Sequence, residues 1–158
     1  MINNDILRRF RYALDISDSA MIEMFKLGGH KTDKAALNAM LKKEEDAGYV
    51  ACNDALMTAF LDGLILKKRG PREGSAAPAK AGDTRLRNNV ILKKMRIALN
   101  LNEDDMLAIM KLAGVVISSS ELSALFRRKD HKHYKECGDQ FLRNFIQGLT
   151  IKNRGEKE

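Results

Sequence analysis

The sequence predicts an all-α protein built from two tandem four-helix repeats, and three observations lead to this fold class. Adding 85 to each position from 3 to 70 gives an ungapped match with positions 88 to 155, in which 22 of 68 residue pairs are identical. An internal match of this length indicates a duplication. Apolar residues recur at helical spacing within each repeat, and no run alternates between apolar and polar residues as a strand would.

Four helices are expected in the first repeat, and each is marked by capping residues and by one apolar face. Asn4 is the expected N-cap of the first helix. The four segments are expected to span Asn4 to Leu14, Ser17 to Gly28, Thr32 to a fraying end at 42–46, and Asn53 or Asp54 to Gly70. The second repeat carries the same signals 85 positions later, with residues 118–120 capping its third helix.

These patterns divide the chain into repeat 1 (1–70), a linker (71–87) and repeat 2 (88–158). The linker contains both prolines and many small residues, which is typical of a flexible connection. A four-helix unit of about 68 residues is near the size at which one core supplies only a few kcal/mol. The repeats are therefore expected to pack on each other as a pseudo-twofold eight-helix domain, and a homodimer is the alternative.

Several classes of protein are excluded or disfavoured by composition. The longest apolar runs are shorter than the 18 residues of a membrane-spanning helix, and the charged N-terminus does not resemble a signal peptide. Two cysteines are too few for a disulfide framework, so a cytoplasmic protein is expected. The sequence lacks a phosphate-binding glycine loop and a Gly-x-Ser-x-Gly motif. We therefore expect no enzymatic activity and no cofactor.

One glycine stands inside the fourth helix of each repeat, Gly63 in the first and Gly148 in the second. Glycine costs roughly 1 kcal/mol relative to alanine in a helix interior. A close helix crossing that leaves no room for a Cβ is the expected reason. The alternative is a ligand that approaches the glycine backbone.

An arginine of the first helix and an aspartate of the fourth are also identical in the two repeats. They predict two ion pairs, Arg11 with Asp54 and Arg96 with Asp139, in which the aspartate also caps its helix. Capping without an ion pair is the alternative.

The two cysteines, Cys52 and Cys137, occupy equivalent positions and are expected to be small buried side chains. The second repeat adds His131 and His133 close to Cys137, together with Asp130 and Asp139, which are all types of metal ligand. The first repeat lacks these histidines, and the spacing matches no zinc pattern. We therefore expect no metal site.

The net charge of +7 is distributed unevenly. Residues 1–70 contain 11 basic and 10 acidic side chains, whereas residues 88–158 contain 13 and 9. Such an excess can reflect helix ends and solvated faces, or it can form a surface for nucleic-acid phosphates. The candidate nucleic-acid-binding residues are Arg85, Arg87, Lys93, Lys94, Arg127, Arg128, Lys129 and Lys132.

A helix-turn-helix formed by the second and third helices is a further alternative for nucleic-acid binding. Gly29 and Gly114 would lie in its turn. Phe25 and Met110 stand where that motif prefers a small residue, and the connection is long. Aromatic residues are scarce, which disfavours recognition of single strands by base stacking.

The whole chain resembles the YehS-like family of bacterial duplicated helical proteins of unknown function. The segments NNDILRRFRYAL, LKKEEDAGY and FLDGLILKKRG carry the resemblance in the first repeat. In the second repeat it is carried by NNVILKKMRIAL and DHKHYKECGDQFLRNFIQGL. The resemblance implies a soluble helical protein with two repeats, and it supplies no catalytic or binding residues.

The function that these features favour is non-catalytic binding, with a basic face that engages nucleic acid or a nucleic-acid-containing assembly. The alternative is a protein-interaction adaptor in which a groove between the repeats takes a partner helix. A membrane partner is not expected.

Overall fold

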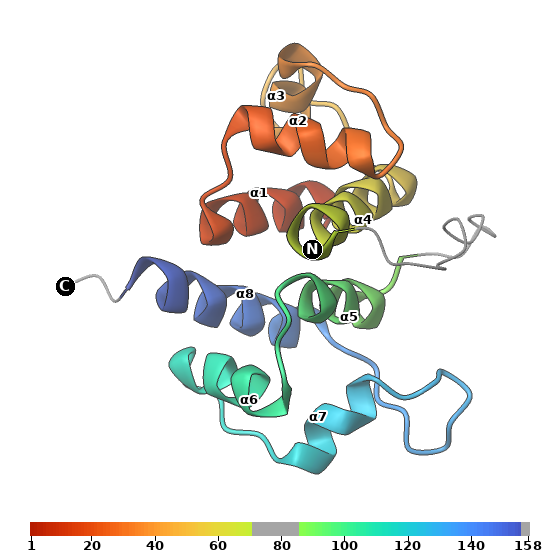
Figure 1. Ribbon diagram of the computed structural model, residues 1–158, viewed down its shortest axis with the longest axis vertical. Helices are drawn as coiled ribbons and strands as arrows, with labels where there is room; N and C mark the ends of the chain where they lie inside the picture. Colours follow the sequence, from red (N-terminus) through yellow and green to blue (C-terminus); the bar gives the residue numbers. More distant parts are fainter. Residues whose placement is uncertain (71–85, 156–158) are drawn as a thin grey trace. The chain divides into compact units, whose positions relative to one another are not determined.

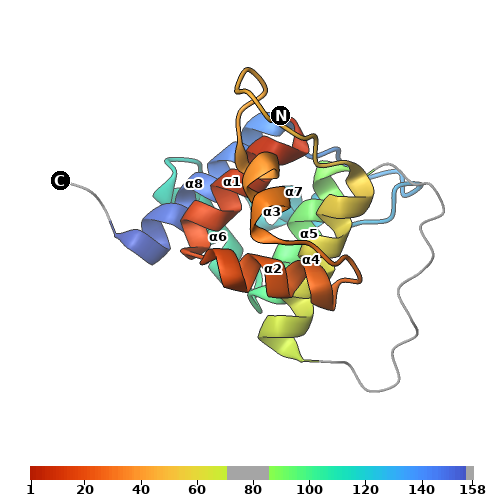
Figure 2. The same cartoon turned by 90° about the horizontal axis from the view of Figure 1, so that it is seen from above.

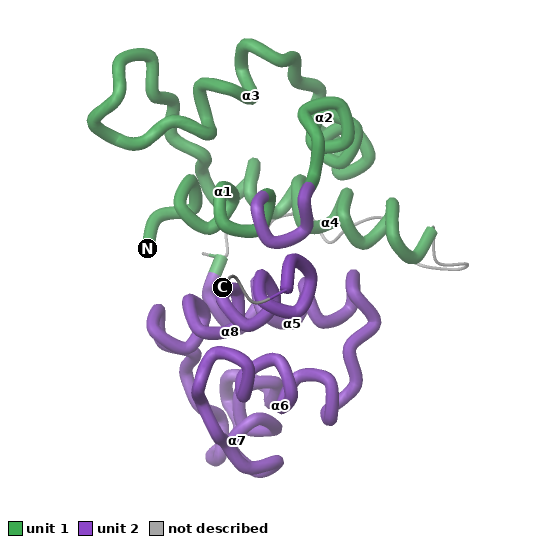
Figure 3. Tube along the Cα trace, turned by 90° about the vertical axis from the view of Figure 1, so that its left-hand side faces the viewer, with its two compact units in different colours: residues 1–11, 16–86 green, residues 12–15, 87–158 purple. Residues whose placement is uncertain are grey.

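The computed structural model describes residues 1–70 and 86–155, and the chain divides into two compact units. The first unit consists of residues 1–11 and 16–86, and the second of residues 12–15 and 87–158 (Figure 3). The predicted linker falls almost wholly on 71–85, outside the described residues, and so does Arg85. The pseudo-twofold packing of the repeats stays a prediction.

Eight helices form the described chain, and residues 1–70 and 86–155 contain no strand (Figure 1). The first repeat contains α1 (Asn3–Leu14), α2 (Asp18–Leu27), α3 (Lys34–Leu41) and α4 (Asp54–Arg69). The second contains α5 (Asn88–Ala98), α6 (Glu103–Leu112), α7 (Ser119–Leu125) and α8 (Asp139–Arg154). The predicted all-α tandem-repeat architecture is confirmed. Of the helices in the described ranges, none has both the length and the apolar character needed to span a bilayer.

The first helix of each repeat buries the same positions. Its inward-facing apolar residues are Ile6, Leu7, Phe10 and Ala13 in α1, and Ile91, Leu92, Met95 and Ala98 in α5. Because full burial of a large apolar side chain contributes about 1.5–3 kcal/mol, this stripe fixes the face that each helix turns to its core. The helical periodicity of the sequence therefore predicts both cores correctly.

Helix α2 packs on α4, as Figures 1 and 2 both show, and α6 packs on α8. A Cβ on Gly63 would lie 1.6 Å from the carbonyl oxygen of Met24, and one on Gly148 would lie 2.0 Å from that of Ile109. These neighbours are backbone atoms, so no change of side-chain rotamer would relieve the overlap. The predicted close crossing is confirmed, and the partner helix itself fills the space beside each glycine.

The crossing in the first repeat has an additional glycine contact. A Cβ on Gly28 would lie 1.8 Å from the carbonyl oxygen of Ala59. The equivalent position in the second repeat is Ala113, which carries a Cβ. Helices α2 and α4 therefore approach more closely at this end than α6 and α8 do.

Side-chain caps begin most of the helices. Ser17 accepts a hydrogen bond from the backbone N of Ala20 at 3.2 Å, as predicted. Ser118 forms a capping box with Glu121, also as predicted for this segment. The cap of α3 is Asp33 rather than the predicted Thr32, because the carboxylate of Asp33 reaches the backbone N of Ala36 at 2.8 Å.

Helices α1 and α5 end in the same way. Asp15 and Asn100 occupy equivalent positions and adopt positive φ angles of 52° and 55°. The residue after each donates its backbone N–H to the first residue of the last turn, Ile16 to Arg11 at 3.1 Å and Leu101 to Arg96 at 3.0 Å. Asp and Asn tolerate this left-handed conformation better than most other side chains, which explains their use here.

Residues 12–15 group with the second unit through the end of α8. The guanidinium carbon of Arg154 lies 3.9 Å from the ring centroid of Tyr12, and its Nε donates to the Tyr12 carbonyl at 2.8 Å. Asn153 donates to the carbonyl of Ala13 at 3.0 Å. A cation–π contact and two hydrogen bonds therefore hold this segment.

Candidate nucleic-acid interface

A buried asparagine in α1 anchors the loop between α3 and α4. Nδ2 of Asn4 donates to the carbonyl oxygens of Met40 and Val50 at 2.8 and 2.9 Å. Its Oδ1 accepts from the backbone N of Cys52 at 2.9 Å and from the hydroxyl of Tyr49 at 3.2 Å. The amide thus uses both donors and both acceptor positions. The predicted role of Asn4 as an N-cap is wrong, because it is the second residue of α1 and binds the loop.

Asn89 anchors the equivalent loop of the second repeat in the same way. Its Nδ2 donates to the carbonyl oxygens of Leu125 and Lys135, both at 2.9 Å, and its Oδ1 accepts from the backbone N of Cys137 at 2.8 Å. The hydroxyl of Tyr134 differs from that of Tyr49, because it is buried and has no hydrogen-bond partner among the described residues. Burial raises the pKa of Tyr134, Glu136 raises it further, and Arg87 opposes the shift.

The preceding asparagine of each repeat fixes the start of the fourth helix. Nδ2 of Asn3 donates to the carbonyl of Cys52 at 3.1 Å and to Oδ1 of Asp54 at 2.8 Å. Asn88 makes the same two bonds to Cys137 and Asp139, at 3.0 and 2.8 Å. These aspartates do not cap their helices, because the N-cap positions are Asn53 and Gly138.

The two predicted ion pairs, Arg11 with Asp54 and Arg96 with Asp139, are wrong. Arg11 pairs with Asp18 at the start of α2. Arg96 donates to the carbonyl of Leu101 at 3.0 Å, and its guanidinium carbon lies 4.8 Å from the centroid of the Phe126 ring. The reason is distance along the helix. Each aspartate lies beside the first residue of α1 or α5, and the arginine is eight residues further, about 12 Å along the axis.

The α3–α4 loop (42–53, the first loop) and the α7–α8 loop (127–138, the second loop) share one hydrogen-bond frame. In the first loop, Asp46 N donates to Lys43 O at 2.9 Å and Tyr49 N to Asp46 O at 3.3 Å. In the second, His131 N donates to Arg128 O at 2.9 Å and Tyr134 N to His131 O at 3.0 Å. Each loop is thus two consecutive turns, and Figure 1 shows the second loop projecting from the helices of its unit.

The two loops have opposite charge on this common frame. The first loop contains two lysines and three acidic residues, Glu44, Glu45 and Asp46. The second contains five basic residues, among them Lys129 and Lys132, and two acidic ones, with both histidines counted as neutral. The formal charge is therefore −1 in the first loop and +3 in the second.

Comparison with known proteins gives the same division into repeats. A family model described as "Protein of unknown function (DUF1456)" matches residues 3–70 and again residues 88–155. The chain belongs to this family. It is 40% identical over 157 residues to "Uncharacterized protein YehS" of Escherichia coli (strain K12). The aligned region covers 99% of this chain and 99% of that protein. No solved structure matches it significantly.

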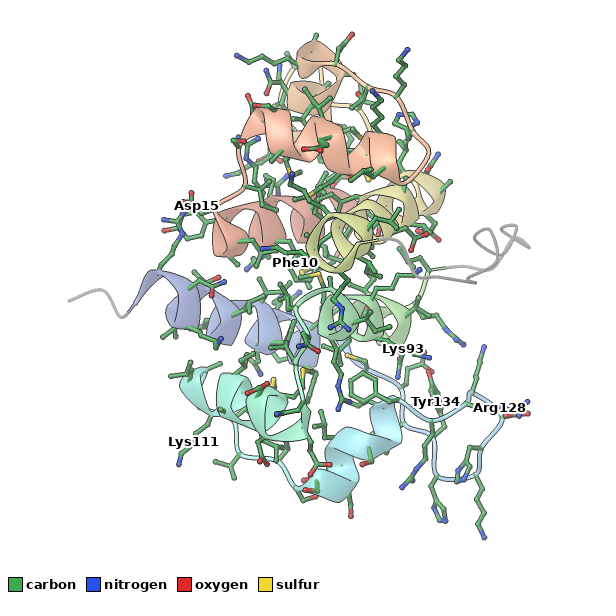
Figure 4. All side chains as sticks on the ribbon, viewed as in Figure 1. Phe10, Asp15, Lys93, Lys111, Arg128 and Tyr134 are labelled. Atoms are coloured by element: carbon green, nitrogen blue, oxygen red, sulfur yellow. The ribbon has the colours of Figure 1, made fainter. Side chains whose placement is uncertain are left out.

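The second DUF1456 repeat brings most of the predicted binding residues to one side. Figure 4 shows Lys93 of α5 on the same side of the unit as Tyr134 and Arg128 of the second loop, with Lys111 on the opposite side. Arg87 directly precedes α5, the helix that carries Lys93, and its charge opposes the rise in the pKa of Tyr134, so we include it in this surface. Of the predicted cations, Lys93, Arg128, Lys129 and Lys132 are exposed, whereas Arg87, Lys94 and Arg127 are half-buried.

Both arginines of the second loop, Arg127 and Arg128, contact other residues of the same loop. Arg127 turns inward and donates to the carbonyl of His133 at 3.1 Å, so it supports the loop. Arg128 lies 3.4 Å from Asp130, but the side chains are 87% and 75% exposed. A pair this exposed contributes little to stability and leaves Arg128 accessible to solvent. We define the basic surface as Arg87, Lys93, Arg128, Lys129 and Lys132.

The cysteines are buried and free. Burial, with a smaller contribution from the carboxylates of Asp54 and Asp139, raises the pKa of both thiols to about 12. Since the thiolate is the nucleophile and the metal ligand, these cysteines are unreactive near neutral pH. Among the residues described, no three His, Cys, Asp or Glu side chains are grouped as a metal site. Nδ1 of His131 instead accepts the backbone N–H of His133 at 3.0 Å.

The structure does not favour the helix-turn-helix alternative. The second helix of such a motif in repeat 2 would be α7, which exposes Ser119, Ser120 and Glu121 and no cation. In repeat 1, α3 exposes Lys34 among small and polar side chains. The cations of the second repeat lie in the loop after α7 instead.

Sequence reasoning missed the asparagine anchors, which position the whole candidate interface. The signal was present, because Asn-Asn, Tyr, Cys and Asp recur at the same spacing in both repeats. Asn4 and Asn89 also stand on the apolar face of their helices. A polar residue repeated on an apolar face, together with repeated loop residues, indicates a buried side chain that bonds to a loop backbone.

Proposed function

We propose that the chain is a non-catalytic binding protein whose basic surface engages nucleic acid or a nucleic-acid-containing assembly. The observation that carries the proposal is the charge difference between two loops on one frame. Exposed clusters of Lys and Arg attract phosphates and speed their association. The cytosol, where nucleic acid is abundant, is the compartment in which we expect this activity.

Lys129 and Lys132, which the first loop replaces by Glu44 and Ala47, are not needed to form the turns of the loop. Glu44 and Glu45 stand in the first loop where the second has Lys129 and Asp130, and the same turns form around both pairs. Concentrating positive charge on a projecting segment raises self-repulsion, and the exposed pair of Arg128 with Asp130 offsets little of it. A ligand of opposite charge supplies that compensation, which supports a binding role.

The inert thiols support a non-catalytic protein. A cysteine nucleophile needs a thiolate near neutral pH, and a pKa of about 12 leaves almost none for Cys52 or Cys137.

The test is the affinity of the full chain for nucleic acid as salt concentration changes. The variant Arg128→Gln with Lys129→Gln and Lys132→Gln removes three exposed charges from the second loop. The matched control removes three exposed charges from the first repeat, Lys31→Gln with Lys34→Gln and Lys43→Gln. Fluorescence anisotropy with a labelled nucleic acid gives the dissociation constant of each.

We expect the loop variant to bind at least about tenfold more weakly and the control to bind within about twofold of the parent. The slope of log affinity against log salt concentration should decrease by about one for each cation that contacts a phosphate. Equal loss of affinity in both variants would show that net charge alone acts, and it would remove the second loop as the site.

A second candidate function is contact with another protein, favoured by exposed apolar side chains at the end of α6. Leu112 is 44% exposed and Val116 is 84% exposed. The first repeat has an equally exposed Leu27 at the position of Leu112 but Lys31 at the position of Val116, so the exposed valine is specific to the second repeat. Exposed apolar residues of this kind are typical of protein contacts.

The variant Val116→Lys tests this second candidate, because it installs the side chain that the first repeat already carries. A protein contact predicts a partner that survives nuclease and high salt and is lost from the variant. If retention of such a partner is the same for parent and variant, Val116 is not part of its site.

A further inference from the structure

We infer that the basic surface binds the phosphate backbone of double-stranded nucleic acid and does not read its bases. The inference rests on the proposed function and narrows it to a ligand class. Three features of the second unit lead to this inference. They are the hydrogen-bond donors of the second loop, the contacts that its aromatic and histidine rings already make, and the residues that helix α7 exposes.

The loop presents side-chain cations, and several of its backbone N–H groups are already engaged within the unit. The N–H groups of residues 131, 133, 134 and 135 donate within the unit, to Arg128 O, His131 Nδ1, His131 O and Ala124 O. A site for a mononucleotide or a free phosphate needs convergent backbone N–H groups, as in a nest or at a helix N-terminus. Separate charges on long side chains suit a polymer instead, where affinity comes from counterions released by many phosphates.

The ring side chains at this surface are already engaged. Phe126 lies under the guanidinium of Arg96, and the hydroxyl of Tyr134 is buried. The rings of His131 and His133 pack on each other, with centroids 5.6 Å apart, and Nδ1 of His131 is hydrogen-bonded. Proteins that bind single strands stack bases on free aromatic faces. Here the guanidinium of Arg96 lies over Phe126, Tyr134 is only partly exposed, and the two exposed histidine rings pack on each other, so this surface favours phosphate contacts over base stacking.

The helix next to the loop cannot read a groove. Helix α7 has seven residues, exposes serines and Glu121, and precedes the loop directly. The commonest base contacts are made by Arg or Lys to guanine and by Asn or Gln to adenine, from an element that enters the major groove, and α7 contains none of these residues. A duplex, with one charge per about 1.7 Å of axis, gives the exposed cations the densest set of phosphates without base contacts.

The experiment measures binding of the full chain to four probes. Two are labelled duplexes of about 20 base pairs with unrelated sequences, one is a labelled single strand of the same length, and ATP is added as a competitor. We expect equal affinity for the duplexes within about threefold, and weaker binding to the single strand. The salt slope on duplex should be about −3.6 if four cations each neutralise one phosphate. ATP at matched phosphate concentration should not compete.

Every other outcome overturns either the proposed function or the inference about double-stranded nucleic acid. Absence of binding to every polymer would overturn the proposed function itself. Tighter binding to the single strand, a sequence preference of tenfold or more, or competition by ATP would overturn the inference and leave nucleic-acid binding standing. The variant Lys93→Gln gives a second check, since loss of one phosphate contact should lower the salt slope by about one on both duplexes alike.

Discussion

The first and second loops are anchored alike and charged in opposite ways. Asn4 and Asn89 bind the same backbone positions in each repeat, and the two consecutive turns of each loop follow the same order. On this frame the first loop carries three acidic residues and the second five basic ones. Anchoring and surface chemistry are therefore separate, because the buried amide holds the backbone whichever side chains point outward. Duplication allows one copy to change its charge while its fold stays intact.

The largest expected effect concerns the shared anchor. We expect Asn4→Ala and Asn89→Ala to destabilise the protein by about 4 and about 3 kcal/mol, since each leaves several buried backbone groups without partners. The first loses one more bond, from the hydroxyl of Tyr49. Urea unfolding followed by far-UV circular dichroism measures both values. If either variant unfolds at the urea concentration of the parent, the frame does not depend on the anchor.

The scaffold beneath the loops is tested by the glycines at the helix crossings. Gly→Ala in a helix normally stabilises by about 1 kcal/mol. We expect Gly63→Ala and Gly148→Ala to do the opposite, by about 3 kcal/mol, because the new Cβ would overlap a carbonyl oxygen. The sign of the change in unfolding free energy is the readout, and a stabilised variant would mean that the helices can separate freely.

Much of this architecture is predictable from sequence, and the parts that are not have physical causes. The repeat, the core faces and the close crossing at Gly63 depend on local periodicity or on one residue type. The partners of Arg11 and Asp54 depend on the relative placement of three helices, which spacing along the chain does not determine. The basic residues of the second loop were identified from charge alone. That Arg127 turns inward and Arg128 outward follows from the fold of the loop.

The two tyrosines sharpen the comparison between the loops. Tyr49 donates its hydroxyl to Asn4, whereas the hydroxyl of Tyr134 is buried and has no hydrogen-bond partner among the described residues. We expect Tyr49→Phe to cost about 1 kcal/mol and Tyr134→Phe to be neutral or stabilising, because an unpaired buried hydroxyl is itself unfavourable. The melting temperatures of the two variants test this difference. Equal losses of stability would show that the two hydroxyls have equivalent surroundings.

The smallest effect is expected at the ends of α1 and α5. Asn100 has a positive φ of 55°, so Asn100→Gly should stabilise by about 0.5 kcal/mol through relief of backbone strain. Asp15→Gly should increase the unfolding free energy by less, because it also removes the contact at 3.3 Å between the Asp15 carboxylate and the guanidinium of Arg154. Comparison of the two melting temperatures tests this difference, and equal gains would show that the Arg154 contact contributes nothing.

An exchange of loop segments tests most directly whether charge on the second loop confers binding. Residues 128–132 are replaced by the sequence of residues 43–47, KEEDA, so that both loops are acidic on the common frame. A second chain carries the reciprocal exchange and keeps the parent's composition. Affinity for a labelled duplex is measured for both, with folding checked by circular dichroism. We predict that the first chain loses salt-dependent binding and that the second recovers it through the basic segment now carried by the first loop. Undiminished binding by the chain with two acidic loops would contradict the account.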